Sequence, residues 1–408
     1  MDRGSLADRV LGTDDPGPLG LLATGWLLWL CVGAWAIMPS SVLPLVMTDL
    51  AIGETAAAWI ITAPQIAAVV GGIPVGMALD RVDNGQAVLL AITLLLVVGL
   101  GNTVLAGAGA YTALLGTRVL GGLGLVTIWI AQTATITRSF PAVREATAVG
   151  LFVTGYPAGY AFGQFTGPLI AGFTDWSVTF AAYATAGFVF GVAFWLVDRQ
   201  ITTTDTSATA PSGVELRRAV RSRGVWGVGL LSLLSYMIYM VFNGWMPTYL
   251  ARTYEIDLAL GGVVTALFPA IGILARPGGG LLSENVFDGR SLPVIAISFL
   301  STGAIAAALG FGGTLAVMAA GLVGAGFAIQ LQFGLLYTLV QRYVPRNVGG
   351  TAVSVVSAVG WLGTFVGPPI VGAIIETTGS YVAVFATAVV LAVLGTGTIL
   401  VLSEPAVR

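Results

Sequence analysis

The chain has 408 residues, of which 56% are apolar and only 9% are charged, and its net charge at neutral pH is −2. Ordinary soluble domains carry about 25% charged residues, so this composition excludes a soluble globular protein and a disordered chain and indicates a membrane protein. The charge balance gives no sign of a nucleic-acid partner. With one cysteine, Cys31, and no histidine, we expect no internal disulfide, no metal site and no cofactor.

Apolar runs bounded by charged and turn residues predict twelve helices, each long enough to cross a hydrocarbon core of about 30 Å. The expected spans are residues 20–46, 55–79, 86–107, 112–136, 146–172, 176–197, 225–250, 260–283, 292–311, 314–339, 349–375 and 380–402. Residues 198–223 are polar and predict a flexible linker, because they cannot bury enough apolar surface to fold alone. We therefore expect a six-helix bundle at 1–197, this linker at 198–223, and a second six-helix bundle at 224–408.

The basic residues predict how the chain is oriented in the membrane. All of them are arginines, and most fall on one side of the expected spans. Cytoplasmic loops collect positive charge, so both termini and the linker are expected in the cytoplasm and the protein in the plasma membrane. The same arginines are expected to contact lipid headgroups.

Short motifs recur at one fixed offset in the two halves of the chain. Gly76 to Asp80 aligns with Gly280 to Glu284, and Arg138 to Pro141 aligns with Arg342 to Pro345. Matches at a single offset indicate a duplicated unit. In a chain this apolar, they predict two membrane half-bundles that face a shared cavity.

The chain resembles a transporter of the major facilitator superfamily over essentially its whole length. The resemblance is carried by Gly76 to Arg81 after the second span, by Gly280 to Glu284, and by the fourth-span pattern of Leu115, Arg118, Gly122 and Gly124. It implies an all-α membrane protein with twelve transmembrane helices in two pseudo-symmetric six-helix bundles. It also implies a cytoplasmic gate formed by Gly76, Asp80, Arg81, Gly280 and Glu284. The alternative is that Asp80 and Arg81 are ordinary charges at helix ends.

Two glycine–proline stretches occupy corresponding places in the fifth and eleventh spans. They consist of Gly163, Gly167, Pro168, Gly363, Gly367 and Pro368. Small residues one turn apart let helix backbones approach closely, and a proline lacks the N–H of a helix hydrogen bond, so we expect close packing and bending. Members of the superfamily often have such a stretch in span five, and some exporters use it as a signature.

Arg276 lies inside a predicted span, and no acidic residue is expected at the same depth. A charge in the membrane costs about 2.5–3.5 kcal/mol, so it normally faces a cavity and has a function there. Arg276 precedes Glu284 by two helical turns, which places it about 12 Å from the cytoplasmic end. A bound anion would supply the missing countercharge. The alternative is an arginine satisfied by helix carbonyls or polar side chains.

The segment Arg276 to Glu284 also resembles the eighth-span segment of nitrate and nitrite porters, which implies anion contact for Arg276. Arg118 is the second arginine within a span, about 30 Å of helix away from Arg138 and hence toward the outer leaflet. Much of the superfamily has an arginine there. Substrate contact, a structural role, proton coupling and snorkelling to the interface are the possible roles of Arg118.

Uncharged polar and aromatic residues fall on the spans expected to line the cavity. The candidates for substrate contact, besides the two arginines, are Gln65, Gln132, Asn243, Trp245, Gln330 and Trp361. Each could instead form a packing contact between helices or an interfacial anchor. Gln330 and Gln332 cannot both face the cavity, because two steps along a helix turn by about 200°.

These features predict a secondary active or facilitative transporter of a small solute, with an anion as the expected substrate. It would act as a monomer through alternating access of its two halves. No buried carboxylate or histidine is visible near Arg276, which favours exchange, facilitated diffusion or potential-driven movement over a carboxylate proton relay. The alternatives are an exporter of hydrophobic or weakly polar compounds and a nontransporting receptor or channel. An enzyme is not expected, because paired acids, metal ligands and phosphate loops are missing.

Overall fold

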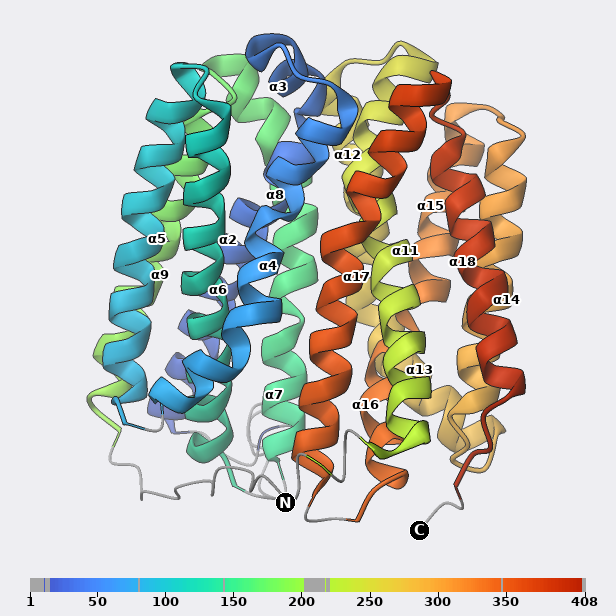
Figure 1. The fold of residues 1–408 in the computed structure, drawn as a ribbon. Coiled ribbons are helices and arrows are strands. Elements are labelled where there is room, and N and C mark those ends of the chain that lie inside the picture. The colour runs from blue at the N-terminus through green and yellow to red at the C-terminus, as the bar shows by residue number, and fades with distance from the viewer. Residues whose placement is uncertain are drawn as a thin grey trace, which may run out of the picture.

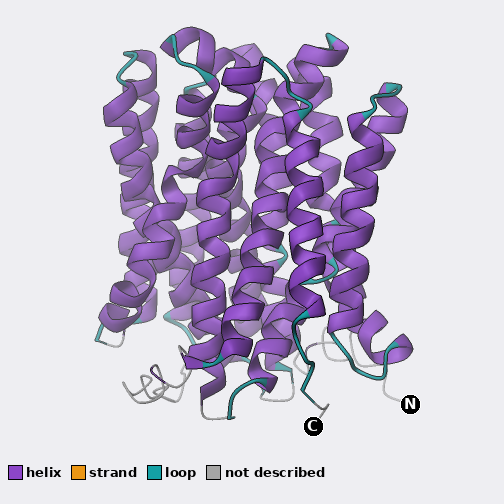
Figure 2. Ribbon diagram, turned by 45° about the vertical axis from the view of Figure 1, so that its right-hand side comes forward, coloured by secondary structure: helices purple, strands orange, loops and turns teal. Residues whose placement is uncertain are grey.

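The computed structural model describes residues 11, 15–79, 81–141, 144–201, 217, 221–345 and 348–405. These residues form helices and no strand, and Figure 2 shows the helices running side by side along one direction. In Figure 1 they form two groups, the first from α2 to α9 and the second from α11 to α18. The start of α2 and the end of α18 lie at the same face of the bundle, called here the terminal face.

The first group contains the helices before the linker. They are α2 (Pro16–Ser41), α3 (Leu43–Leu50), α4 (Glu54–Leu79), α5 (Asn84–Gly107), α6 (Tyr111–Ser139), α7 (Glu145–Val153), α8 (Gly155–Phe173) and α9 (Val178–Asp198). Caps fix several of their starts: the Asp83 side chain accepts a hydrogen bond from the backbone N–H of Gln86, and Pro16 stands in the first turn of α2.

The second group repeats the arrangement after the linker. Its helices are α11 (Arg223–Tyr254), α12 (Leu258–Ala270), α13 (Gly272–Val286), α14 (Leu292–Gly310), α15 (Leu315–Gln330), α16 (Phe333–Arg342), α17 (Gly349–Thr378) and α18 (Ala383–Leu400). Asp257 and Thr314 cap α12 and α15 through their side-chain oxygens. Of the predicted linker, residues 202–216 and 218–220 lie outside the described part of the chain.

Eleven helical segments of the described chain are long and apolar enough to cross a membrane. The broken helix pair α7–α8, which packs along α2, corresponds to the remaining predicted span. The sequence predicted unbroken spans, whereas four of them are interrupted, at Val42, Thr154, Ile271 and the pair Leu331–Gln332. Pro269 lies in the last turn of α12, where its missing N–H weakens the helix just before the break at Ile271.

The two glycine–proline stretches lie where helices of the same group approach most closely. A Cβ on Gly163 in α8 would lie 2.8 Å from the Cα of Ala34 in α2, and one on Gly363 in α17 would overlap the carbonyl oxygen of Leu233 in α11. The pairs α2–α8 and α11–α17 occupy equivalent places in the two groups. Their glycines therefore allow backbone-to-backbone packing that a larger side chain would prevent.

The two groups meet along α4 and α17 and along α8 and α12. Near the face opposite the termini, the Glu376 carboxylate of α17 accepts hydrogen bonds from the backbone N–H and the hydroxyl of Thr55 at the start of α4, at 3.2 and 2.5 Å. The Tyr381 hydroxyl donates to Glu54 at 3.3 Å. Glu376 thus satisfies the free N–H at the beginning of a helix in the other group. We call this the opposite-face latch.

Toward the terminal face the contact is looser. A Cβ on Gly76 of α4 or on Gly280 of α13 would meet nothing within 4 Å. The two groups are joined by hydrogen bonds at the latch, and no hydrogen bond between described residues of the two groups lies near the terminal face.

A cross-linking experiment should detect this asymmetry. In a Cys31→Ala background, the pair Thr55→Cys and Glu376→Cys should be joined efficiently by a short bifunctional thiol reagent, because the two side chains touch. The pair Gly76→Cys and Gly280→Cys, on α4 and α13 with free space beside each glycine, is the negative control and should react poorly. Cross-linked and free protein are distinguished by mass spectrometry. Failure of the pair Thr55→Cys and Glu376→Cys to cross-link would show that the latch is open in the resting protein.

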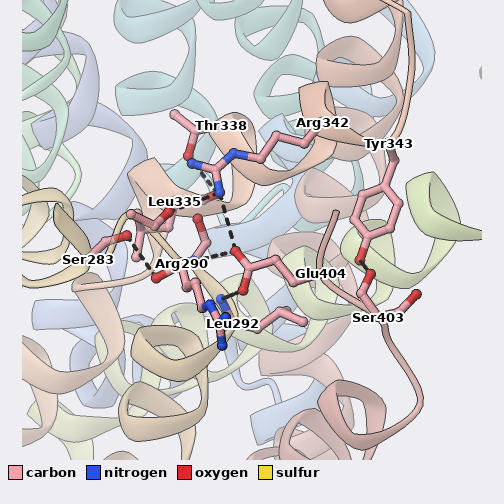
Figure 3. Close-up of polar contacts among 11 residues, drawn as sticks. Ser283, Arg290, Leu292, Leu335, Thr338, Arg342, Tyr343, Ser403 and Glu404 are labelled. Atoms are coloured by element: carbon pink, nitrogen blue, oxygen red, sulfur yellow. Dashed lines mark hydrogen bonds and ion pairs between the residues drawn. The ribbon is translucent and has the colours of Figure 1, made fainter. Parts of the chain in front are cut away.

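The C-terminal segment is tied to the terminal face of the second group (Figure 3). The Glu404 carboxylate accepts hydrogen bonds from the backbone N–H groups of Ser291 and Leu292 at the start of α14, at 2.5 and 3.1 Å, and forms an ion pair with Arg342 at 3.3 Å. The Tyr343 hydroxyl donates to the carbonyl oxygen of Ser403 at 2.8 Å. We call this arrangement the C-terminal strap.

Candidate functional site

A row of aromatic rings crosses the centre of the bundle from the first group to the second. Tyr156 and Tyr160 lie one turn apart on α8, with ring centroids 4.8 Å apart. Tyr160 stacks on Tyr239 of α11 at 6.0 Å, and Tyr239 meets Phe333 of α16 edge to face at 5.5 Å. Tyr156 also contacts Trp361 of α17 at 6.3 Å. We call these five rings the aromatic row.

Arg276 stands at the second-group end of the aromatic row. It is half-buried on α13, with its guanidinium carbon 5.1 Å from the centre of the Phe333 ring. Its Nε donates a hydrogen bond to Gln330 at 3.3 Å, whereas Nη1 and Nη2 donate none to a described residue. Among the described residues, one ion pair lies within 4 Å, and it joins Arg342 to Glu404. No described carboxylate therefore neutralises Arg276.

The Tyr239 hydroxyl adds a polar group beside this guanidinium. Tyr239 is only 4% exposed, and its hydroxyl lies next to Arg276 without forming a hydrogen bond to a described residue. A buried hydroxyl without a partner costs about 1–3 kcal/mol, so a polar ligand or water that bonded to it would recover that free energy. Arg276 and Tyr239 together present unpaired donors between the two groups of helices.

Arg118 has the opposite environment. It is fully buried, and all three of its nitrogen atoms donate to backbone carbonyls: Nε to Ile60 at 3.0 Å, Nη1 to Trp35 at 3.0 Å and Nη2 to Ala36 at 2.7 Å. The guanidinium also stacks on the Trp35 ring at 4.3 Å. The sequence predicted a possible substrate contact for Arg118. This geometry instead uses its donors to join α2, α4 and α6.

The predicted glutamines fall into two kinds. Gln65 on α4 and Gln132 on α6 are fully buried, and neither amide atom of either residue has a hydrogen-bond partner in the described chain. Gln65 lies beside Tyr156 of the aromatic row. Gln332, at the break between α15 and α16, is also buried with both amide atoms unpaired. Gln330, in contrast, forms hydrogen bonds to other residues through both its amide nitrogen and its amide oxygen.

The other predicted contacts mainly join helices. Asn243 on α11 donates to the Tyr239 carbonyl at 2.8 Å and accepts from the Gln164 side chain of α8 at 3.0 Å, which links the two groups. The indole N–H of Trp245 donates to the Pro368 carbonyl at 2.9 Å. Sequence reasoning did not identify Gln164, although Tyr156, Tyr160 and Gln164 follow one another at four-residue spacing and so share a face of α8.

The structure describes four of the five predicted gate residues. Asp80 lies outside the described residues. Arg81 and Glu284 are exposed at the terminal face, and Gly76 and Gly280 face open space. In this conformation none of the four described gate residues takes part in an ion pair with another described residue.

These observations define a multi-pass helical membrane protein whose two packed groups of helices enclose a polar, aromatic centre. The chain belongs to the Major Facilitator Superfamily, because the sequence model of that family matches residues 24–368. Two solved structures of a bacterial homologue of the human lysosomal transporter Spinster, both inward-facing, share this fold. The unoccupied form has a TM-score of 0.76 at 16% identity and the occupied form 0.74 at 18%, with 95% of both chains covered in each case.

Several curated proteins are similar in sequence. The nitrite extrusion protein of Bacillus subtilis is 25% identical over 261 residues, which cover 64% of each chain. The probable nitrate transporter NarT of Staphylococcus haemolyticus is 23% identical, over 62% of this chain and 64% of the relative. The probable nitrate/nitrite transporter NarK2 of Mycobacterium tuberculosis is 25% identical, over 80% of this chain and 81% of the relative. The chain thus spans just under two thirds of the first two relatives.

Proposed function

We propose that the protein moves a small anion across the membrane, with Arg276 as the residue that binds it. The observation that carries this proposal is a half-buried guanidinium at the centre of the bundle, whose Nη1 and Nη2 are unpaired and which no described carboxylate neutralises. Charged groups in membranes are normally paired or functional. An anion with two oxygen atoms would match the two donors of the guanidinium fork.

The relatives support the same class of substrate. Their names refer to nitrate or nitrite, so these two anions are the first to test. The neighbouring Tyr239 hydroxyl would supply another donor, and the unpaired amides of Gln65 and Gln132 would supply polar contacts from the first group. Trp361 and the other rings of the aromatic row would form the walls of the binding site.

Within this proposal the remaining residues have conformational roles. Residues 1–197 and 224–408 form two halves that rock about the central site, joined by the linker at 198–223. Gly76, Asp80, Arg81, Gly280 and Glu284 close the terminal face, and the opposite-face latch closes the other. Arg118 holds α2, α4 and α6 together and does not contact the anion.

We further infer that the protein acts as a monomer in the plasma membrane, with the terminal face in the cytoplasm. The arginine-rich loops at that face support this orientation. No described carboxylate touches Arg276, which supports exchange or potential-driven movement of the anion over a carboxylate proton relay.

Uptake by purified protein in lipid vesicles tests the proposal. Wild-type protein should take up nitrate or nitrite with saturation and show counterflow, and Arg276→Ala should lower uptake at least about tenfold, because a hydrogen bond to a charged group contributes about 1.5–3 kcal/mol. Arg276→Lys should retain part of the uptake, since lysine keeps the charge but not the fork. Arg290→Ala, an exposed arginine in the same half, is the matched control and should transport normally.

Three results would contradict the proposal. Equal anion uptake by wild type and Arg276→Ala would remove this residue from the mechanism. Export of hydrophobic compounds without anion uptake would favour the alternative of a drug exporter, and uptake without saturation would favour a channel.

A further inference from the structure

Gln330 occupies a fully buried position at the break between α15 and α16. Its Nε2 donates to the carbonyl oxygen of Phe268 at 3.0 Å and to that of Gly326 at 3.2 Å. Its Oε1 accepts from Nε of Arg276 at 3.3 Å. One amide therefore connects the end of α12, the end of α15 and the arginine on α13.

These contacts determine which way the amide points. A glutamine amide has two N–H donors, and here both face carbonyl oxygens, which cannot donate in return. The oxygen must therefore face Arg276, where it accepts a hydrogen bond from a donor that is always protonated. Gly272 allows this placement, because a Cβ at that position would overlap the Gln330 amide.

The Gln330 amide helps to orient the guanidinium of Arg276. Gln330 engages Nε, the innermost nitrogen, and the guanidinium carbon lies over the Phe333 ring, 5.1 Å from its centre. These two contacts restrict the rotation of the guanidinium. The edge formed by Nη1 and Nη2 then remains available to a ligand, unlike that of Arg118, whose three nitrogens all bond to carbonyls.

We propose that Gln330 is a positioning residue that orients Arg276 so that its two terminal nitrogens bind a planar oxyanion. This inference rests on the proposed function of Arg276 and adds a source of selectivity to it. Gln330 does not contact the anion itself, because each of its polar atoms is already bonded to protein. A fixed fork favours a planar anion with two oxygens over a spherical anion, which needs no particular orientation of the donors.

Substitution by methionine tests this role, since methionine is unbranched and of similar length but lacks the amide. In vesicles, Gln330→Met should raise the KM for nitrate about tenfold, the equivalent of about 1.4 kcal/mol, and change the maximal rate less than about twofold. The affinity for chloride, measured by its inhibition of nitrate uptake, should fall much less than the affinity for nitrate. The preference for nitrate over chloride should therefore decrease. Gln341→Met, an exposed glutamine on α16, is the matched control and should behave as wild type.

A second variant, Gly272→Ala, disturbs the hydrogen bond between Gln330 and Arg276 without changing either residue. Gly272→Ala leaves Gln330 in place but pushes its amide away from Arg276, and it should also reduce the preference for nitrate over chloride. A purely structural role would lower thermal stability and maximal rate without changing that preference.

The outcomes separate this inference from the proposed function. If wild-type uptake depends on Arg276 but Gln330→Met keeps the wild-type KM and anion preference, Gln330 is not a positioning residue. If wild-type protein takes up none of these anions, both proposals fail.

Discussion

Replacement of Arg118 by methionine should destabilise the protein by about 3 kcal/mol or more. The change removes three buried hydrogen bonds and leaves the carbonyls of Trp35 and Ile60 unpaired, because the residues four places on, Pro39 and Pro64, have no N–H; each unpaired buried group costs about 1–3 kcal/mol. It also removes the stacking of the guanidinium on Trp35. Thermal unfolding of the purified protein in detergent, followed by tryptophan fluorescence, measures the loss.

Two further variants show whether the effect is structural. Arg118→Lys should lose less stability than Arg118→Met, because an ammonium group keeps the charge but cannot reach three carbonyls in the same geometry. Arg276→Met should cost far less, since Arg276 makes one hydrogen bond and remains half-buried. A variant Arg118→Met that is as stable as wild type but takes up no anion would instead assign Arg118 to the binding site.

Gly122→Val should prevent stable folding. Gly122 lies where α6 crosses α4, and a Cβ there would overlap the carbonyl oxygen of Pro64 and approach the Ala67 side chain to 2.8 Å. The helices would have to separate, and overpacking of this kind costs about 1–3 kcal/mol or more when the obstacle is backbone. Because the neighbouring Gly121 packs on Trp35, the shift would also disturb the helix that Arg118 holds.

Gly116 provides the control on the same helix. A Cβ on Gly116 meets nothing within 4 Å, so Gly116→Val tests the intrinsic effect of valine in α6 without the clash. It should leave thermal stability nearly unchanged or slightly higher, because glycine is a poorer helix former than valine by some tenths of a kcal/mol. The yield of monodisperse protein and its unfolding temperature decide the comparison. Similar values for the two variants would mean that α4 and α6 can separate at little cost.

The class of fold could be predicted from the sequence because lipid imposes a minimum length on apolar segments. The number and order of the spans follow from that constraint, whereas the expectation of two duplicated halves rests on the motifs repeated at one offset. The break at Leu331–Gln332 could not be predicted, since no proline or charge marks it, whereas Pro157, which leaves the carbonyl of Val153 without its helix N–H, does mark the break at Thr154. Interruptions of this kind depend on the partners that a helix meets after folding.

The two arginines within the spans illustrate the limit for the candidate site. Sequence gives the depth of Arg118 and Arg276 in the membrane, but it does not give their partners. Backbone carbonyls surround Arg118, and carbonyls belong to every residue, so no side-chain pattern identifies them. The partner of Arg276 was among the predicted polar residues, yet Gln330 could be distinguished from Gln332 only by its contacts with Phe268 and Gly326.

The opposite-face latch shows the same limit over a longer distance. Glu376 and Thr55 are 321 residues apart in the sequence. Each is a polar residue near the end of a predicted span, and nothing in the sequence indicates that they meet. Neither belongs to the motifs that repeat between the halves. Their pairing becomes visible only when the start of α4 lies against the end of α17.

The C-terminal strap has a mechanical consequence. Its hydrogen bonds and its ion pair run from the last described residues to α14 and α16, all within the second group of helices. They stiffen that group without attaching it to the first. During a conformational cycle, α14, α16 and residues 403 and 404 would therefore move together as a rigid body. Bending would concentrate where the two groups of helices meet, along α4, α8, α12 and α17.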